Sequence, residues 1–303
     1  MGAADVIPGV SGGTIAFITG IYERLITAIK NINFKTLKLL FTGKVRAFWD
    51  AIDGNFLLFL VAGIATSLLS FAKLITHLLE NYPILVWSFF FGLIIASTVF
   101  VGKTVKWNLK TGLAFVILTV AAYFITSPTN TPIASQHELW YIFLSAAIAI
   151  CAMILPGISG SFILLLLGEY LFILKALTSF NFPVIFVFIA GALIGIISFS
   201  NVLSWLFKHF KMITLASLTG FMFGSLNKIW PWKETLTTFY DSEGQLHPLT
   251  QRNLLPHQFE TITGNSSQLI GAITLIIIGF VLIFSIEYVA DFIQKRRLQQ
   301  VDE

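Results

Sequence analysis

The sequence predicts an all-α membrane protein: a polytopic helical bundle of two inverted-topology repeats, each with a re-entrant or broken helix. Three observations predict this class. Of the 303 residues, 56% are hydrophobic and 11% are charged, whereas a soluble domain carries about 25% charged residues. Apolar stretches of membrane-spanning length recur along the chain, and a Pro-Gly-x-Ser-Gly motif occurs twice. The composition excludes a globular domain surrounded by water.

Seven stretches approach the roughly 20 mainly apolar residues that a transmembrane helix needs. They are residues 56–79, 84–102, 111–126, 139–155, 183–207, 212–228 and 268–288. Two shorter apolar stretches, 14–22 and 161–174, each follow a Pro-Gly turn. Because Pro and Gly interrupt regular structure, we interpret residues 6–22 and 156–174 as broken helices rather than ordinary spans.

Lysine and arginine residues predict the orientation, because they are enriched in cytoplasmic loops. The loops on one predicted side, with the C-terminus, hold Arg24, Lys30, Lys35, Lys38, Lys44, Arg46, Lys103, Lys106, Lys110, Lys208, Lys211, Lys295, Arg296 and Arg297. The opposite loops hold Lys175, Lys228, Lys233 and Arg252. We therefore predict a cytoplasmic C-terminus and an external loop at residues 230–265.

The predicted cytoplasmic segment at residues 24–55 is amphipathic. Apolar residues recur there at helical spacing with lysines between them, at Leu25, Ile29, Ile32, Leu37, Leu40 and Phe41. One interpretation is a set of helices on the inner leaflet, where lysines meet anionic headgroups. The alternative is an amphipathic linker that packs on the bundle.

The repeat extends well beyond the two motifs. Residues 8–12 return as residues 156–160, and residues 20 and 22 match residues 168 and 170, all at an offset of 148. Later matches, such as Gly92 with Gly220, follow an offset of 128. Equivalent loops lie on opposite predicted sides, which is typical of secondary transporters with discontinuous helices. We predict a first repeat with three spans at residues 1–126 and a second, inverted repeat at residues 137–290.

Each motif places a Pro-Gly turn directly before an apolar helix. The free N–H groups and the positive dipole end of such a helix form a site for an anion. Hydroxyl groups and glycines add donors and close approach, so the expected phosphate-binding residues are Pro8, Gly9, Ser11, Gly12, Gly13, Thr14, Pro156, Gly157, Ser159, Gly160 and Ser161. The alternative is that these small residues serve only close helix packing.

Four charged residues near the motifs are candidates for coupling or support. Asp5 precedes the first motif, and a carboxylate inside a membrane is a functional candidate; its alternative roles are a helix cap or a pair with Arg24. Glu23, Arg24 and Glu169 follow the broken helices near the predicted interfaces, where we expect solvated structural roles.

Catalytic and cofactor motifs are missing from the sequence. The five histidines form no metal-ligand spacing, and no nucleotide-binding loop or serine-hydrolase elbow occurs. The single cysteine, Cys151, lies in an apolar run, which favours an inert thiol. Basic residues lie in short loops between spans rather than in a nucleic-acid-binding patch. We expect no enzyme, cofactor, metal site or nucleic-acid partner.

Both motifs carry a family resemblance. Residues 2–14 read Gly-Ala-Ala-Asp-Val-Ile-Pro-Gly-Val-Ser-Gly-Gly-Thr, and residues 154–161 read Ile-Leu-Pro-Gly-Ile-Ser-Gly-Ser. They resemble the bacterial PopT family of undecaprenyl-phosphate translocases, over nearly the whole chain. The resemblance implies return of this polyprenyl lipid carrier from the outer to the inner leaflet of the cytoplasmic membrane, where it is recycled for cell-envelope synthesis.

Two other functions remain open on sequence grounds. Helix N-termini rich in glycine and serine suit a small soluble anion, such as phosphate or chloride, as well as they suit a lipid phosphate. A membrane scaffold would use the repeats for packing alone. For a lipid phosphate, a membrane potential that is negative inside opposes inward movement by about 2.3 kcal/mol per charge and 100 mV, so we expect either proton or cation coupling or neutralisation of the charge in the site.

Overall fold

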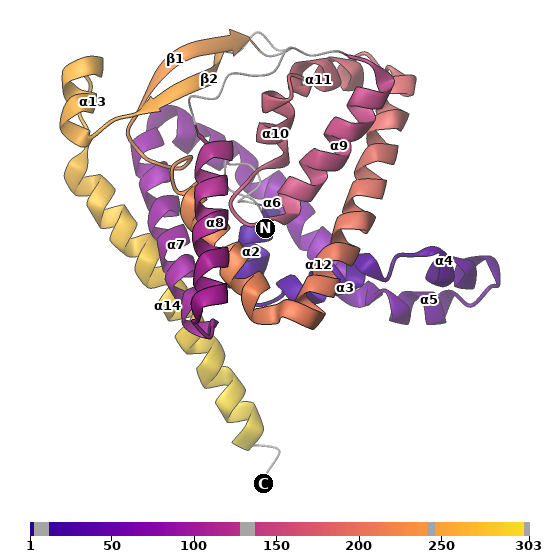
Figure 1. Ribbon diagram of the computed structural model, residues 1–303. Coiled ribbons are helices and arrows are strands. Elements are labelled where there is room, and N and C mark those ends of the chain that lie inside the picture. Colours follow the sequence, from indigo (N-terminus) through magenta and orange to yellow (C-terminus); the bar gives the residue numbers. More distant parts are fainter. Residues whose placement is uncertain (3–11, 128–136, 241–245, 300–303) are drawn as a thin grey trace.

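Figure 1 shows the computed structural model, a helical bundle with one small β-hairpin. It describes residues 1–2, 12–127, 137–240 and 246–299. The elements are α2 (Gly12–Ile18), α3 (Tyr22–Lys30), α4 (Phe34–Phe41), α5 (Val45–Ala51), α6 (Gly54–Asn81), α7 (Pro83–Thr104), α8 (Leu109–Ile125), α9 (Leu139–Ile154), α10 (Gly160–Leu166), α11 (Tyr170–Thr178), α12 (Phe182–Ser225), β1 (Lys233–Tyr240), β2 (Leu246–Asn253), α13 (Pro256–Thr263) and α14 (Leu269–Gln299).

Helices occupy all seven predicted spans, which confirms the fold class. Within the described ranges, α7 and α12 are long and apolar enough to cross a membrane, and two bent helix pairs raise that number to four. The apolar helices α8, α9 and residues 269–285 of α14 are shorter. The predicted boundary between spans 183–207 and 212–228 is confirmed, because α12 consists of two helical parts that meet at a kink at Phe210 (φ −133°, ψ 42°). No Pro or Gly lies at this kink, which falls between Lys208 and Lys211.

The sequence predicted one of the two bends but not the other. The pair α10 and α11 bends by 113° at the predicted broken helix. The second bend, of 70°, joins α5 to α6 at residues 52–53. It was not predicted; there Asp53, directly before Gly54, adopts the left-handed backbone conformation (φ 53°).

The short helices after the two motifs correspond residue for residue. The bounds of α2 and α3 shifted by 148 give those of α10 and α11. Gly20 and Gly168 close the two short helices with φ values of 72° and 75°, a conformation that glycine adopts without strain. Figure 1 shows α3 and α11 on opposite faces of the bundle. This correspondence supports the inverted repeats, whereas their limits at residues 1–126 and 137–290 stay a prediction.

Glycines bring the long helices into close contact. A β-carbon on Gly92 of α7 would lie 2.0 Å from the carbonyl oxygen of Ile276 on α14, and one on Gly220 of α12 would lie 2.2 Å from that of Phe115 on α8. Small residues at such crossings let helix backbones approach in membranes. As a result α7 packs along α14, and the second part of α12 packs along α8.

Replacing Gly92 with alanine should destabilise the bundle by forcing α7 and α14 apart. Overpacking of this kind costs about 1–3 kcal/mol, so we expect the unfolding temperature in detergent to fall by roughly 3–10 °C. Gly112→Ala is the matched control, because a β-carbon there meets nothing within 4 Å. Equal unfolding temperatures for both variants would contradict the close crossing.

The segment at residues 24–55 is helical, as predicted. Helices α4 and α5 form a hairpin that projects from the side of the bundle (Figure 1). Phe34 and Phe41 of α4 are 93% and 90% exposed, and Lys35 and Lys38 on the same helix are exposed as well. The hairpin therefore presents both apolar and cationic side chains away from the core.

The predicted external loop contains structure that the sequence analysis missed. Residues 233–240 and 246–253 pair as the antiparallel strands β1 and β2, and α13 follows them. The indole nitrogens of Trp230 and Trp232 donate to the carbonyls of Leu254 and Ser267, at 2.8 and 2.9 Å. The hairpin, α11 and α13 lie on one face of the bundle, and the last turns of α14 extend from the other (Figure 1).

Candidate functional site

The two motif segments meet in the middle of the bundle. The backbone N–H of Gly157 donates to the hydroxyl oxygen of Thr14 at 2.9 Å, and both residues are buried. Helix α2 also rests on the end of α9, because a β-carbon on Gly13 would lie 2.6 Å from the carbonyl oxygen of Ile154. The hydroxyl of Tyr22 donates to that same oxygen at 3.0 Å. Segments 143 residues apart in the chain therefore share one polar contact.

The second motif makes a tight turn that only glycine fits. Gly157 has φ of 99°, which side chains rarely adopt. A β-carbon there would lie 2.3 Å from the Ser225 hydroxyl oxygen at the end of α12. That hydroxyl donates to the Met222 carbonyl at 2.8 Å. The turn is thus wedged between α2 and the end of α12, and Pro156 beside it is buried.

Helix α10 begins with two serine hydroxyls, those of Ser159 and Ser161. Ser159 stands at its N-cap but makes no capping hydrogen bond through its side chain. Instead the hydroxyls of Ser159 and Ser161 lie 2.6 Å apart, and Ser161 is exposed. Gly160 packs closely on α9, where a β-carbon would lie 2.9 Å from the Ala149 carbonyl oxygen. Amides and hydroxyls at this end of α10 have the donor chemistry that an anion needs.

The first motif is described only in part. Gly12, Gly13 and Thr14 are buried at the start of α2. The other expected site residues of this motif, Pro8, Gly9 and Ser11, lie outside the described residues, as does Asp5. The contact between Thr14 and Gly157 is therefore the observation that joins the two halves of the expected site.

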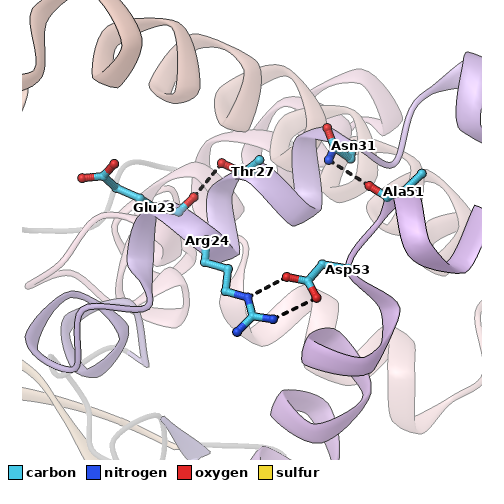
Figure 2. Close-up of polar contacts among 6 residues, drawn as sticks. All are labelled: Glu23, Arg24, Thr27, Asn31, Ala51 and Asp53. Atoms are coloured by element: carbon cyan, nitrogen blue, oxygen red, sulfur yellow. Dashed lines mark hydrogen bonds and ion pairs between the residues drawn. The ribbon is translucent and has the colours of Figure 1, made fainter. Parts of the chain in front are cut away.

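Arg24 and Glu23 secure α3 at the surface rather than at the motifs. Arg24 forms two hydrogen bonds with the Asp53 carboxylate, at 2.6 and 3.0 Å (Figure 2), and these bonds hold the pKa of Asp53 below its usual value. The alternative pairing of Arg24 with Asp5 lies outside the described residues. Glu23 pairs with Lys211 beside the kink of α12 at 2.7 Å. Asn31 donates to the Ala51 carbonyl at 2.9 Å, which fixes the bend before α6 (Figure 2).

Glu169 lies in the interior, so the expectation of a solvated side chain is wrong. Its side chain has no exposed surface. One carboxylate oxygen lies 3.2 Å from Nδ1 of His137, and the other accepts from the backbone N–H of His137 at 3.4 Å. The turn at Gly168 leads the chain back to the segment before α9, where the His137 ring stacks on Phe172 at 4.2 Å. This pair supports the bend between α10 and α11.

Two lysines near the second motif were not singled out from the sequence. The Lys228 ammonium lies 4.1 Å from the ring centre of Phe162, in the first turn of α10. The Lys233 ammonium lies 4.2 Å from the ring of Trp87 on α7 and donates to the Lys228 carbonyl. The signal in the sequence was a pair of cations beside two tryptophans, on the predicted side that is poor in lysine and arginine.

An apolar groove lies away from the motifs, between α6, α7 and α14. Its volume is about 460 Å³, and its walls include Leu78, Val86, Phe89, Phe90 and Leu275. No polar surface lines it. Among the residues described, no three His, Cys, Asp or Glu side chains gather as metal ligands. The groove suits a hydrocarbon chain.

Known proteins resemble the chain over most of its length. Residues 1–247 match a family described as undecaprenyl phosphate translocase-like. A polyprenyl-phosphate transporter of Vibrio cholerae serotype O1 is 46% identical over 292 residues, which are 96% of this chain and 94% of the relative. A polyprenyl-phosphate transporter of Staphylococcus aureus is 32% identical over 250 residues, 76% of this chain and 83% of the relative. No solved structure matches the chain.

Proposed function

The chain belongs to the undecaprenyl phosphate translocase-like family, and from this membership we propose that it returns undecaprenyl phosphate from the outer to the inner leaflet of the bacterial cytoplasmic membrane. Transport of polyprenyl phosphate is the function of the curated relatives. In this chain it is supported best by one observation, the buried hydrogen bond between Thr14 and Gly157. That contact brings two helix starts with anion-binding chemistry to the same depth of the bundle.

The phosphate group is held where the two motifs meet. The N–H groups that begin α2 and α10 and the hydroxyls of Ser159 and Ser161 donate to its oxygens. Charge-assisted bonds of this type are roughly twice as strong as neutral ones. The close packing of Gly13 and Gly160 on α9 keeps both helix starts in place, so the donors need little rearrangement when the ligand arrives.

The polyprenyl tail leaves the protein sideways. A chain of this length cannot enter the bundle, and the apolar groove between α6, α7 and α14 offers a hydrocarbon surface without polar groups. The charged headgroup then moves through protein while the tail stays in contact with lipid. The family name and this groove favour a lipid phosphate over the alternative of a soluble phosphate or chloride ion.

Inward movement of the headgroup requires a second driving force. With the inside negative, each negative charge moved inward costs about 2.3 kcal/mol per 100 mV. Co-transport of a proton or cation offsets this cost, and Asp5 remains the candidate for proton coupling, outside the described residues. The function is movement of a lipid rather than a reaction, so we infer that the chain is not an enzyme.

The lysine-rich face lies in the cytoplasm. This places the C-terminus inside, as the lysine and arginine distribution predicts. The α4–α5 hairpin then lies at the inner leaflet, where Phe34 and Phe41 insert between lipids and Lys35 and Lys38 face anionic headgroups. Their exposure, above nine-tenths for both phenylalanines, supports this arrangement.

Reconstituted vesicles test the function. Purified protein in liposomes should move a fluorescent polyprenyl phosphate between leaflets faster than protein-free vesicles do, as measured by protection of the dye from an impermeant quencher. The matching polyprenol, which lacks the phosphate, should not be moved faster. If chloride or inorganic phosphate crosses the membrane while the labelled lipid stays in place, the soluble-anion alternative is correct.

A further inference from the structure

Two lysine side chains after α12 each lie against an aromatic ring. Lys228 follows α12 and reaches the ring of Phe162, and Lys233 begins β1 and reaches the ring of Trp87, at 4.1 and 4.2 Å. A hydrogen bond from the Lys233 side chain to the Lys228 carbonyl joins the two residues. Both side chains are half-buried. Each cation is stabilised in part by an aromatic face.

This pair has no acidic partner in the ranges that the structure describes. The nearest acidic residue in sequence, Glu234, is paired with Arg252 at 2.7 Å, and neither lysine lies within ion-pair distance of a described carboxylate. Burial holds the pKa of Lys233 well below its usual value, and the charge of Lys228 lowers it further. Desolvated cations are costly unless an anion or hydrogen bonds compensate them. An anion at this position would remove that cost.

The lysine pair contacts two rings that are neighbours in sequence of the groove and of the second motif. Phe162, under the Lys228 ammonium, is the third residue of α10 and follows Ser161 directly. Trp87, under the Lys233 ammonium, follows Val86, which lines the groove. The two lysines therefore connect a residue next to the groove wall with a residue next to the serines at the start of α10.

We propose that Lys228 and Lys233 form a capture site for the phosphate monoester of the lipid at the outer leaflet, before the phosphate reaches the two motifs. This inference rests on the proposed function. Lysine suits the task because its ammonium is a compact charge with three donors that tolerates many phosphate orientations. Free phosphate shares this chemistry, but the adjoining apolar groove favours a phosphate that carries a hydrocarbon tail.

Binding measurements on the full-length protein in nanodiscs test the proposal. The ligands are undecaprenyl phosphate, undecaprenol and inorganic phosphate, and the variants are Lys228→Gln, Lys233→Gln and both together. Each single change should weaken undecaprenyl-phosphate binding about tenfold, as expected for a lost bond to a charged group. The Lys→Arg variants should retain binding. Arg252→Gln is the matched control, because Arg252 is exposed and already paired.

The outcomes separate this proposal from the function on which it rests. Unchanged affinity in the double variant, with tight binding to the wild type, overturns the capture site and leaves the transport function intact. Equal binding of undecaprenol and undecaprenyl phosphate to the wild type overturns the function itself. Full competition by inorganic phosphate overturns the lipid assignment of the site.

Footprinting of the wild-type protein covers the case in which the glutamine variants do not fold. Undecaprenyl phosphate should protect Lys228 and Lys233 from an amine-reactive reagent, as measured by mass spectrometry, and undecaprenol should not. The exposed Lys106 and Lys110 serve as internal references. Reaction of Lys228 and Lys233 at the same rate with and without bound undecaprenyl phosphate contradicts the proposal.

Discussion

Replacing Gly157 with alanine should reduce polyprenyl-phosphate transport to below about a tenth of the wild-type rate. Two free-energy costs, one from the backbone conformation and one from overpacking, combine at this residue. The backbone φ of 99° disfavours any side chain, by about 1–2 kcal/mol. The new β-carbon would also lie 2.3 Å from the Ser225 hydroxyl, and such overpacking costs about 1–3 kcal/mol. The measurement is the initial rate in reconstituted vesicles, normalised to folded protein.

Two further variants separate strain from overlap at Gly157. Gly264→Ala also introduces a side chain at positive φ, 69°, but its β-carbon meets nothing within 4 Å. This variant should therefore show only the free-energy cost of the backbone conformation, without the cost of overpacking. Adding Ser225→Gly to Gly157→Ala removes the overlapping atoms and should restore part of the transport rate. Wild-type transport by Gly157→Ala alone would show that the turn does not need its described geometry.

Replacing Thr14 with valine should reduce transport about 10- to 100-fold. Valine keeps the shape of the side chain but removes the oxygen that accepts the Gly157 N–H. A buried donor left without an acceptor costs about 1–3 kcal/mol, and the cost falls on the contact that joins the two motifs. Serine keeps the hydroxyl, so Thr14→Ser should transport at nearly the wild-type rate. Initial rates in vesicles measure both.

Thr19 provides the matched control for Thr14. It lies at the other end of the same short helix, is exposed, and bonds only locally to the carbonyls of Ile15 and Ala16. Thr19→Val should therefore leave transport unchanged. Equal losses in Thr14→Val and Thr19→Val would assign both effects to folding of α2 rather than to the contact between the motifs.

Apolar length and Pro-Gly turns were enough to predict the helices of the bundle. Spans such as α7 are apolar throughout, and no soluble arrangement competes with a transmembrane helix for them. The division of α12 into two parts was predictable as well, because the cationic residues Lys208 and Lys211 mark the membrane boundary on both sides of the kink at Phe210. The hairpin β1–β2 was missed because, outside the membrane, length and hydrophobicity no longer decide secondary structure.

The candidate site was predictable as a pair of motifs but not as a set of contacts. The repeat predicted that both Pro-Gly turns matter, and the hydrogen bond from Gly157 to Thr14 is consistent with that. Which atoms touch depends on how α2, α9 and α12 pack, and this information does not reside in either motif. The lysine pair was missed because the direction of a long side chain after a helix end is set by the aromatic rings around it.

The pairing of α7 with α14 and of α8 with the second part of α12 bears on how the protein moves. In the proposed division, α8 is the last helix of the first repeat and α14 is the last helix of the second. Each of them packs against a helix of the other repeat, so the two repeats exchange their last helices. Two repeats joined in this way cannot move apart as rigid bodies without breaking the contacts of α7 with α14 and of α8 with α12. Alternation between leaflets should therefore arise from tilting of short segments such as α10 and α11 inside a stationary frame, and a crosslink between α7 and α14 should leave turnover intact.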